Sequence, residues 1–188
     1  MSPRLFVIAG PSGVGKGTLI RLVLERMPAL AFATSATTRP ILPGEVDGRD
    51  YHFLSDEEFR ARVERGEFLE HVEFAGHRYG TLRGEVERRL ESGRSVVLEI
   101  DVPGAREIRR QRPDAVLVFI VPPSLDELES RLRLRGANSP QQVEARLEIA
   151  SRELEAKPEF QHVIVNDDKH RAADALTRVI LAELEESP

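Results

Sequence analysis

The sequence predicts an α/β fold in which helices flank a parallel sheet that carries a phosphate-binding loop, with a small α+β lobe inserted and a helical lid. A glycine-rich loop joins a buried apolar run to a helical pattern within residues 5–27. Further apolar runs alternate with helical patterns later in the chain, and the segment 34–81 interrupts this alternation. At 188 residues the chain is long enough for one such domain and too short for two ordinary ones.

The glycine-rich loop, GPSGVGKGT, follows the strand-like run LFVIA and precedes the helical pattern of residues 18–27. Glycine permits sharp turns and lets successive backbone N–H groups approach an anion. The spacing fits the P-loop pattern, in which a lysine reaches the β- and γ-phosphates at a helix N-terminus. We therefore expect an ATP site made by the whole loop: Gly10, Pro11, Ser12, Gly13, Val14, Gly15, Lys16, Gly17 and Thr18.

One position departs from the strict pattern, because Gly17 stands where Ser or Thr usually supplies a hydroxyl to Mg²⁺. Thr18 comes one residue late, so we expect it to meet a phosphate or support the loop and to be a weak metal ligand at best. Mg²⁺ would then depend on waters, nucleotide oxygens and a carboxylate from elsewhere, which its reluctance to lose water allows.

Composition limits the partners. The 27 Lys and Arg residues face 32 Asp and Glu residues, and this net charge of −5 argues against nucleic acid or an anionic membrane as the main partner. Without cysteine, disulfides and thiolate metal sites are excluded. The apolar runs are too short to span a bilayer, and no signal peptide is recognisable. We expect a cytoplasmic enzyme that acts on small-molecule substrates and is either a monomer or a homodimer.

Apolar runs of strand length predict the parallel sheet: residues 5–9, 95–100, 115–121 and 162–166. Helical patterns lie between and after them: 18–27, 82–92, 104–111, 125–134, 140–156 and 170–185. In such folds ligands bind at the carboxyl ends of the strands, so the site is expected just after Ala9, Ile100 and Val121.

The inserted segment holds the strand-like pieces TSATT, YHFL and EFLEHVEFA and a Gly-Pro-rich link. A short helix is expected to open at Ser55, because Glu58 three residues on gives a capping-box signature. Binding residues tend to gather in turns, and the turns here are rich in candidates: Arg39, Arg49, Tyr51, Glu70, Arg78, Tyr79 and Thr81.

Two carboxylates end the run VVLEID, and we expect Glu99 and Asp101 to share one face of a strand beside the loop strand. A carboxylate there suits a Mg²⁺–phosphate centre, with Asp101 preferred, directly or through water. The alternative is that they only cap the next helix or face solvent.

The arginine-rich stretch RLRLRGANSPQQVEAR predicts a helix–loop–helix lid. Its Arg135 and Arg146 have planar donor groups that match phosphate oxygens. They could instead form ordinary helix-surface pairs with Glu129, Glu144 or Glu148.

The sequence resembles the guanylate kinase family over nearly its whole length. The motifs that carry this resemblance are GPSGVGKGT, SATTRP, PGEVDGRDYHF, GEFLEHVEFAGHRYGT, VVLEIDVPGA, VFIVPPSLDELESRLRLRG and VIVNDD. The resemblance implies ATP-dependent phosphorylation of GMP, with dGMP as a further substrate and Mg²⁺ as cofactor. It divides the single domain into a core (1–33, 82–125 and 158–188), a GMP-binding lobe (34–81) and a lid (126–157).

By position, the resemblance also implies roles for individual residues. Guanine would meet Ser35, Glu70 and Thr81, and the GMP phosphate would meet Arg39, Tyr51 and Tyr79. Glu99 and Asp101 would complete the GMP side, and Asn166 would approach the adenine of ATP. The implied catalytic charges are Lys16, Arg39, Arg135 and Arg146, with Arg135 also binding ATP.

The chemistry of guanine agrees with these roles. A carboxylate accepts hydrogen bonds from N1–H and the exocyclic amine, and hydroxyl groups donate to O6. Adenine has neither the N1–H and 2-amino donors nor the O6 acceptor of guanine. Mispaired buried polar groups are costly, so such a site can prefer guanine over adenine on the order of 10⁴-fold.

Two positions depart from the family pattern. Leu42 stands where a second phosphate-binding arginine is usual, and Pro103 replaces a common glutamine. Two alternatives therefore stay open. The chain could be a non-catalytic module that has the same fold and binds a protein partner, or it could be a related sugar-phosphate kinase.

Overall fold

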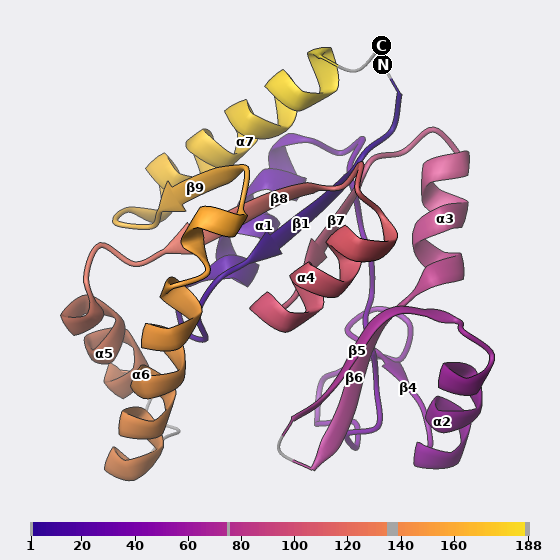
Figure 1. The fold of residues 1–188 in the computed structure, drawn as a ribbon, viewed down its shortest axis with the longest axis horizontal. Coiled ribbons are helices and arrows are strands. Elements are labelled where there is room, and N and C mark those ends of the chain that lie inside the picture. Colours follow the sequence, from indigo (N-terminus) through magenta and orange to yellow (C-terminus); the bar gives the residue numbers. More distant parts are fainter. Residues whose placement is uncertain (1, 75, 135–138, 187–188) are drawn as a thin grey trace.

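The computed structural model describes residues 2–74, 76–134 and 139–186. Its central feature is a five-stranded sheet with the order β2-β7-β1-β8-β9, in which all neighbouring strands are parallel (Figure 1). The strands are β1 (Leu5–Ala9), β2 (Ala31–Phe32), β7 (Val96–Glu99), β8 (Val116–Val121) and β9 (His162–Val165). The predicted parallel sheet is thus confirmed, and the two-residue edge strand β2 is an addition to it.

Helices cover both faces of this sheet. On one face α1 (Lys16–Arg26) packs beside α7 (Lys169–Glu185), and on the other lie α3 (Arg83–Glu91) and α4 (Val102–Gln111) (Figure 1). Because both faces are covered, every residue of β1 is buried, and its side chains alternate between two apolar clusters. Phe6 and Ile8 face α1 and α7, whereas Leu5 and Val7 face α4.

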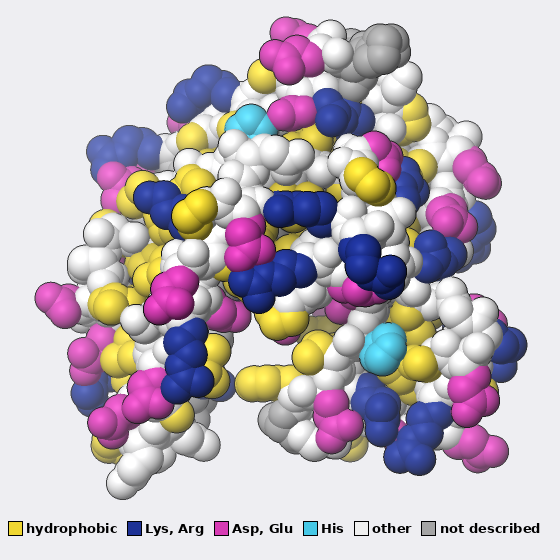
Figure 2. All heavy atoms as spheres, viewed as in Figure 1, with side chains coloured by type: hydrophobic (Ala, Val, Ile, Leu, Met, Phe, Trp, Pro, Cys, Tyr) yellow, Lys and Arg dark blue, Asp and Glu magenta, His cyan; other side chains and the backbone are white. Residues whose placement is uncertain are grey.

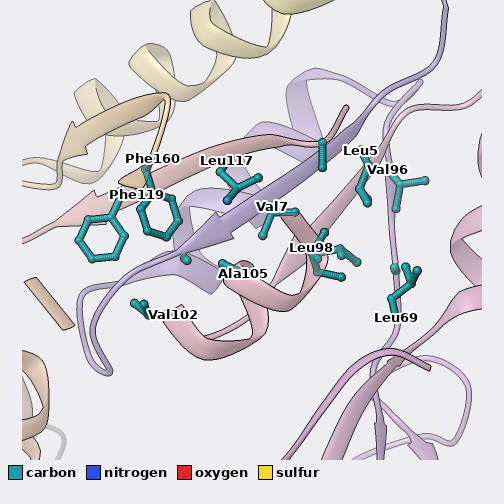
Figure 3. Close-up of a cluster of buried hydrophobic side chains, with 14 of the residues drawn as sticks. Leu5, Val7, Leu69, Val96, Leu98, Val102, Ala105, Leu117, Phe119 and Phe160 are labelled. Carbon is teal, nitrogen blue, oxygen red and sulfur yellow. The ribbon is translucent and has the colours of Figure 1, made fainter. Parts of the chain in front are cut away.

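Figure 3 shows the α4 side of the core. Val7 and Leu117 point from the sheet toward Ala105, and Phe119 lies beside Phe160, with the ring centroids 4.6 Å apart. The close contact of these side chains holds α4, and with it the residues at its N-terminus, against the carboxyl ends of the strands.

A second, four-stranded sheet is built from the inserted segment in the order β4-β3-β6-β5. Its strands are β3 (Ala36–Thr37), β4 (His52–Phe53), β5 (Phe68–Phe74) and β6 (His77–Leu82). The predicted helix is present as α2 (Asp56–Glu64), with Ser55 as its N-cap accepting a hydrogen bond of 3.1 Å from the N–H of Glu58. Strand β6 was not predicted, because its polar sequence HRYGTL becomes a strand only through pairing with β5.

A helical hairpin forms the third part of the molecule. Helices α5 (Leu125–Leu134) and α6 (Pro140–Leu154) share a small apolar cluster of Leu128, Leu132, Val143 and Ala150, and a 3₁₀ turn (Lys157–Glu159) leads back to the sheet. Helix α6 ends two residues earlier than the sequence predicted. Arg135 lies outside the described residues. No helix within the described ranges has the length and apolar character needed to cross a membrane.

The turn after β1 brings the backbone very close to β8. Gly10 has a φ of 145°, and a Cβ at this position would lie 2.3 Å from the carbonyl oxygen of Ile120. We expect Gly10→Ala to lower the free energy of unfolding by at least ~2 kcal/mol, because the backbone of one strand must shift. Urea denaturation measures this change.

Gly84→Ala is the matched control, since a Cβ at Gly84 meets no atom within 4 Å and the residue lies in α3. That variant should be neutral or up to ~1 kcal/mol more stable. Equal stability of the Gly10 variant and the unmodified protein would contradict the close approach to β8.

Candidate active site

The loop between β1 and α1, the end of β7 and the end of β8 meet at one edge of the parallel sheet. Strand β1 pairs with β7 on one side and with β8 on the other, so the positions after Ala9, Ile100 and Val121 lie together, as the sequence predicted. The surface is hollowed on the same side of the molecule, between the α5–α6 hairpin and the four-stranded sheet (Figure 2). The α5–α6 hairpin and the inserted sheet thus flank the phosphate loop from opposite sides.

The phosphate loop depends on glycine at three positions. Gly10, Gly13 and Gly15 all have positive φ, and Gly15 is the N-cap of α1. A Cβ at Gly13 would lie 2.6 Å from the side chain of Leu132, and one at Gly15 would lie 2.7 Å from Nδ2 of Asn166. The loop therefore presents backbone N–H groups at a helix N-terminus, which is the arrangement that binds anions.

Lys16 lies across this loop. Its Nζ atom donates hydrogen bonds to the carbonyl oxygens of Gly10, at 2.7 Å, and Pro11, at 3.3 Å. These carbonyls hold the ammonium group over the loop, where it can contact a bound polyphosphate. Thr18 lies in the first turn of α1, and Ser12 is exposed at the tip of the loop.

Asn166 is hydrogen-bonded to the phosphate loop. Its buried amide donates a 2.8 Å hydrogen bond to the carbonyl of Val14, and its backbone N–H binds the carbonyl of Val121 at 2.8 Å. Arg131 donates a hydrogen bond of 2.9 Å to the Asn166 carbonyl. The sequence reasoning did not single out Arg131, whose only signal was its place in the arginine-rich stretch.

Glu99 and Asp101 do not share a strand face, so that prediction was wrong. Strand β7 ends at Glu99, and Asp101 is the N-cap of α4, with Oδ1 accepting a hydrogen bond of 2.8 Å from the N–H of Gly104. The chain turns into the helix at once because Pro103 suits the first helical turn, where a missing N–H costs nothing. Asp101 thus caps α4, which the sequence analysis gave as the alternative role, and its Oδ1 atom accepts the capping hydrogen bond.

Glu99 occupies the space that a larger residue at Gly17 would take. Its Oε2 atom lies 3.0 Å from the position of a Cβ at Gly17. The residue that replaces the usual hydroxyl of the P-loop pattern therefore makes room for a carboxylate. Carboxylate oxygens are the ligands that Mg²⁺ prefers, so the donor set at Glu99 and Asp101 fits this ion. No group of three or more His, Cys, Asp or Glu residues that could hold a metal occurs in the described ranges.

The predicted guanine-binding residues come together at the inner end of the four-stranded sheet. Glu70 on β5 pairs in register with Thr81 on β6, and the Thr81 hydroxyl donates to Glu70 Oε1 at 2.6 Å. Both side chains are buried, with Glu70 5% exposed. Ser35 precedes the Ala36–Gly80 pair and so lies beside Thr81 along the register.

Burial raises the pKa of Glu70 to about 7, with the charge of Asp101 adding to the rise and the Thr81 hydroxyl opposing it. The carboxyl binds its proton more tightly in the folded protein than in the unfolded chain, whose pKa is 4.5. Folding is therefore disfavoured increasingly as the pH rises from 4.5 through 7, on the order of 3 kcal/mol in total.

This shift predicts a pH-dependent effect of Glu70→Gln on stability. The free energy of unfolding of the variant minus that of the unmodified protein should be larger at pH 8 than at pH 5 by up to about 3 kcal/mol, because the variant lacks the buried charge that destabilises the unmodified protein at pH 8. Urea denaturation at both pH values measures it. A difference that stays constant with pH would show that Glu70 titrates normally.

The predicted phosphate-binding residues of the inserted sheet also lie together. The Arg39 guanidinium is 5.4 Å from the ring centroid of Tyr51, and the Tyr51 and Tyr79 centroids are 6.2 Å apart. Arg39 forms a two-point ion pair with Glu45, at 2.7 and 3.0 Å, and the hydrogen bonds to Glu45 raise its pKa. Glu45 was not singled out from the sequence, because its proximity to Arg39 depends on how the intervening loop folds.

Two further arginines in the turns of this lobe, Arg49 and Arg78, are paired with carboxylates of their own. Arg49 is paired with Asp50 at 2.7 Å, and Arg78 is paired with Asp56 at 2.8 Å. Leu42 itself is 54% exposed, and its N–H donates to Glu45 at 2.8 Å. The loop thus contributes a backbone group that orients Glu45 and, through it, Arg39.

In the helical hairpin, Arg146 lies on α6 and is partly buried. Two of its three predicted alternative partners are engaged elsewhere, Glu129 with Arg133 at 2.5 Å and Glu148 with Arg152 at 3.8 Å. Arg146 is on the side of α6 that carries the buried Val143 and Ala150, three and four residues away.

Comparison with known proteins agrees with this geometry. A family model described as guanylate kinase matches residues 2–183. The guanylate kinase of Rubrobacter xylanophilus is 50% identical over 177 residues, which cover 94% of this chain and 93% of that protein. The guanylate kinase of a Nostoc species is 49% identical over 176 residues, covering 94% and 88%.

Solved structures show the same relation. The crystal structure of guanylate kinase from Anaplasma phagocytophilum has a TM-score of 0.78 and 32% identity, and covers 97% of this chain and 86% of that one. A gluconokinase from Sinorhizobium meliloti has a TM-score of 0.53 at 18% identity, with 100% and 99% covered, and so shares the fold alone. The match over nearly the full length, together with the loop and sheet geometry, shows that the chain belongs to the guanylate kinase family.

Proposed function

We propose that this chain transfers the γ-phosphoryl group of ATP to GMP. It also accepts dGMP, because the proposed site selects the base more strongly than the sugar. A phosphate oxygen of GMP attacks the γ-phosphorus in line, the bond to the β-phosphate oxygen breaks, and ADP and GDP leave. The observation that carries the proposal is a glycine phosphate loop together with a buried Glu70–Thr81 pair that lies beside Asp101, since Glu70 Oε2 and Asp101 Oδ1 are 3.1 and 3.0 Å from the position of a Cβ at Gly104. The first suits a triphosphate, and the second suits a base with N–H donors.

Recognition of guanine follows from Glu70. When ionised, this carboxylate accepts hydrogen bonds from N1–H and the exocyclic amine of guanine, and the hydroxyls of Thr81 and Ser35 are available to O6. Adenine would leave the buried carboxylate without these donors, which is costly. Since the pKa of the free carboxyl is about 7, guanine binding favours loss of its proton.

Recognition of the GMP phosphate is assigned to Arg39, Tyr51 and Tyr79. The Arg39 fork holds the two carboxylate oxygens of Glu45, and the same two-point donor geometry suits phosphate oxygens, which supports this assignment. The phenol groups of the two tyrosines lie within the same cluster. Burial raises the pKa of Tyr51, and the charge of Glu99 adds to this rise.

The donor side is assigned to the loop, Lys16 and Arg146, with Arg135 retained as a prediction from the resemblance. Glu99 and Asp101 would hold Mg²⁺ directly or through water, and the bound ion neutralises charge on the phosphates. No covalent intermediate is needed, because positioning and electrostatic stabilisation account for most of the rate in phosphoryl transfer. Asn166 keeps the loop in shape and closes the side of the site where adenine is expected.

A coupled assay of ADP production tests the function. Mg·ATP is offered with GMP, dGMP, AMP, UMP or ribose bisphosphate in separate reactions. We expect turnover with GMP and dGMP that exceeds the others by several orders of magnitude. Turnover with ribose bisphosphate alone would establish the sugar-phosphate alternative, and no turnover with any acceptor would favour a binding module.

A further inference from the structure

Glu153 is a half-buried carboxylate beside the phosphate loop that the proposed reaction does not use. It lies on α6, seven residues after Arg146 and three after the buried Ala150, and so on the same side of the helix. The buried side of α6 faces the loop through α5, because Ala150 packs with Leu132 and a Cβ at Gly13 of the loop would lie 2.6 Å from Leu132. The charge of Lys16 and the backbone N–H of Ser12 both act on the Glu153 carboxylate. A negative charge is thus built into a site for negative phosphates.

The surroundings of Glu153 are unfavourable for a carboxylate. Its Oε2 atom is fully enclosed and has no hydrogen-bond partner among the described residues. Burial raises its pKa and the charge of Asp101 raises it further, whereas Lys16 and the Ser12 N–H oppose the rise. Buried polar atoms are nearly always paired, so an unpaired carboxylate oxygen on the helix beside the phosphate loop calls for an explanation. A neutral side chain of similar size could pack at this position without the cost of burying a charge.

We propose that Glu153 is a specificity-determining residue that makes the phosphate loop select the magnesium complex of ATP over metal-free ATP. The inference rests on the proposed function, because it assumes that the loop binds ATP. Glu153 competes with an incoming phosphate for the Ser12 N–H and for Lys16. The competition disfavours every polyphosphate, but most strongly the one that carries the most negative charge.

The expected size follows from the charges. Metal-free ATP has two more negative charges than its magnesium complex, so repulsion from one fixed carboxylate falls more heavily on the free form. In a partly hydrated site this difference corresponds to about five- to tenfold in relative affinity. Glu99 and Asp101 add to the same preference, but they come from another part of the fold, the end of β7 and the start of α4.

The test is calorimetric binding of the non-hydrolysable analogue AMP-PNP at pH 8, once with excess Mg²⁺ and once with EDTA. For the unmodified protein and for Glu153→Gln, the quantity compared is the ratio of the Kd in EDTA to the Kd in Mg²⁺. We expect this ratio to fall about five- to tenfold in Glu153→Gln, mainly because metal-free AMP-PNP binds more tightly. Glu153→Met, a second neutral variant, should give the same ratio if the glutamine variant folds poorly.

Two controls separate charge from packing. Glu153→Asp keeps the charge and should keep most of the selectivity, and Glu148→Gln removes a 66% exposed carboxylate of the same helix and should change nothing. An unchanged ratio in both neutral variants overturns the proposal, as does an equal gain or loss of affinity in both buffers. If the unmodified protein binds AMP-PNP in neither buffer, the proposed function itself fails.

Discussion

Lys16→Met should lower kcat for phosphoryl transfer from ATP to GMP by 10² or more. The ammonium group is the charge that the phosphate loop places over the polyphosphate, and it is held there by the carbonyls of Gly10 and Pro11. Charge builds up on the oxygens between the β- and γ-phosphorus atoms as the bond breaks, and loss of one preorganised charge at such a position costs about 10²- to 10³-fold. Steady-state kinetics at saturating Mg·ATP measure the change.

Methionine has a similar length and keeps the apolar stem, so the fold should be retained. Lys157→Met is the matched control, since Lys157 is exposed in the 3₁₀ turn after α6. Its kcat should remain within a factor of two of the unmodified protein, as expected for a surface change. A Lys16 variant with near-normal kcat would remove the loop lysine from the mechanism.

Glu70→Gln should abolish most of the preference for GMP over AMP. The amide presents one acceptor and one donor where guanine needs two acceptors, so the N1–H or the exocyclic amine loses its partner. We expect kcat/KM for GMP to fall by about 10² or more, with little change for AMP, because an unpaired buried polar group costs about 1–3 kcal/mol and more when charged. The ratio of kcat/KM values for the two nucleotides is the quantity to measure.

Glu73→Gln provides the comparison on the same strand. Glu73 is 63% exposed and pairs with Arg78 at 3.6 Å, away from Thr81. The nucleotide preference of this variant should match that of the unmodified protein. If Glu70→Gln also kept its preference, recognition of guanine would have to come from other groups.

The extent to which the fold follows from the sequence differs between its parts. Strands β1, β7 and β8 were predicted because they are buried on both faces, which leaves continuous apolar runs such as that of β8. Strand β9 lies at the edge of the sheet with Val163 and Val165 exposed, and it was predicted from its short apolar run alone. Strands β2 and β6 could not be predicted in this way. The first is two residues long, and the second is a polar segment whose strand geometry depends on its neighbours β3 and β5.

The candidate site shows a similar division. Residues inside recognisable motifs, such as Lys16 and Glu70, could be predicted as site residues from the sequence, and the structure places Glu70 beside Thr81. Asp101 was misplaced because a run of apolar residues does not show where a strand stops and a helix cap begins. Glu45 and Glu153 act through contacts set by a loop path and by helix packing, which no local pattern in the sequence records.

Titration calorimetry with AMP-PNP and Mg²⁺, and separately with GMP and AMP, tests the central claim that one hollow joins a triphosphate loop to a guanine-selective pocket. The account predicts heat of binding for AMP-PNP that disappears in a variant with two loop changes, Lys16→Met and Gly13→Val, and binding of GMP but not AMP that persists in that variant. Absence of AMP-PNP binding to the unmodified protein, or equal affinity for GMP and AMP, would contradict it.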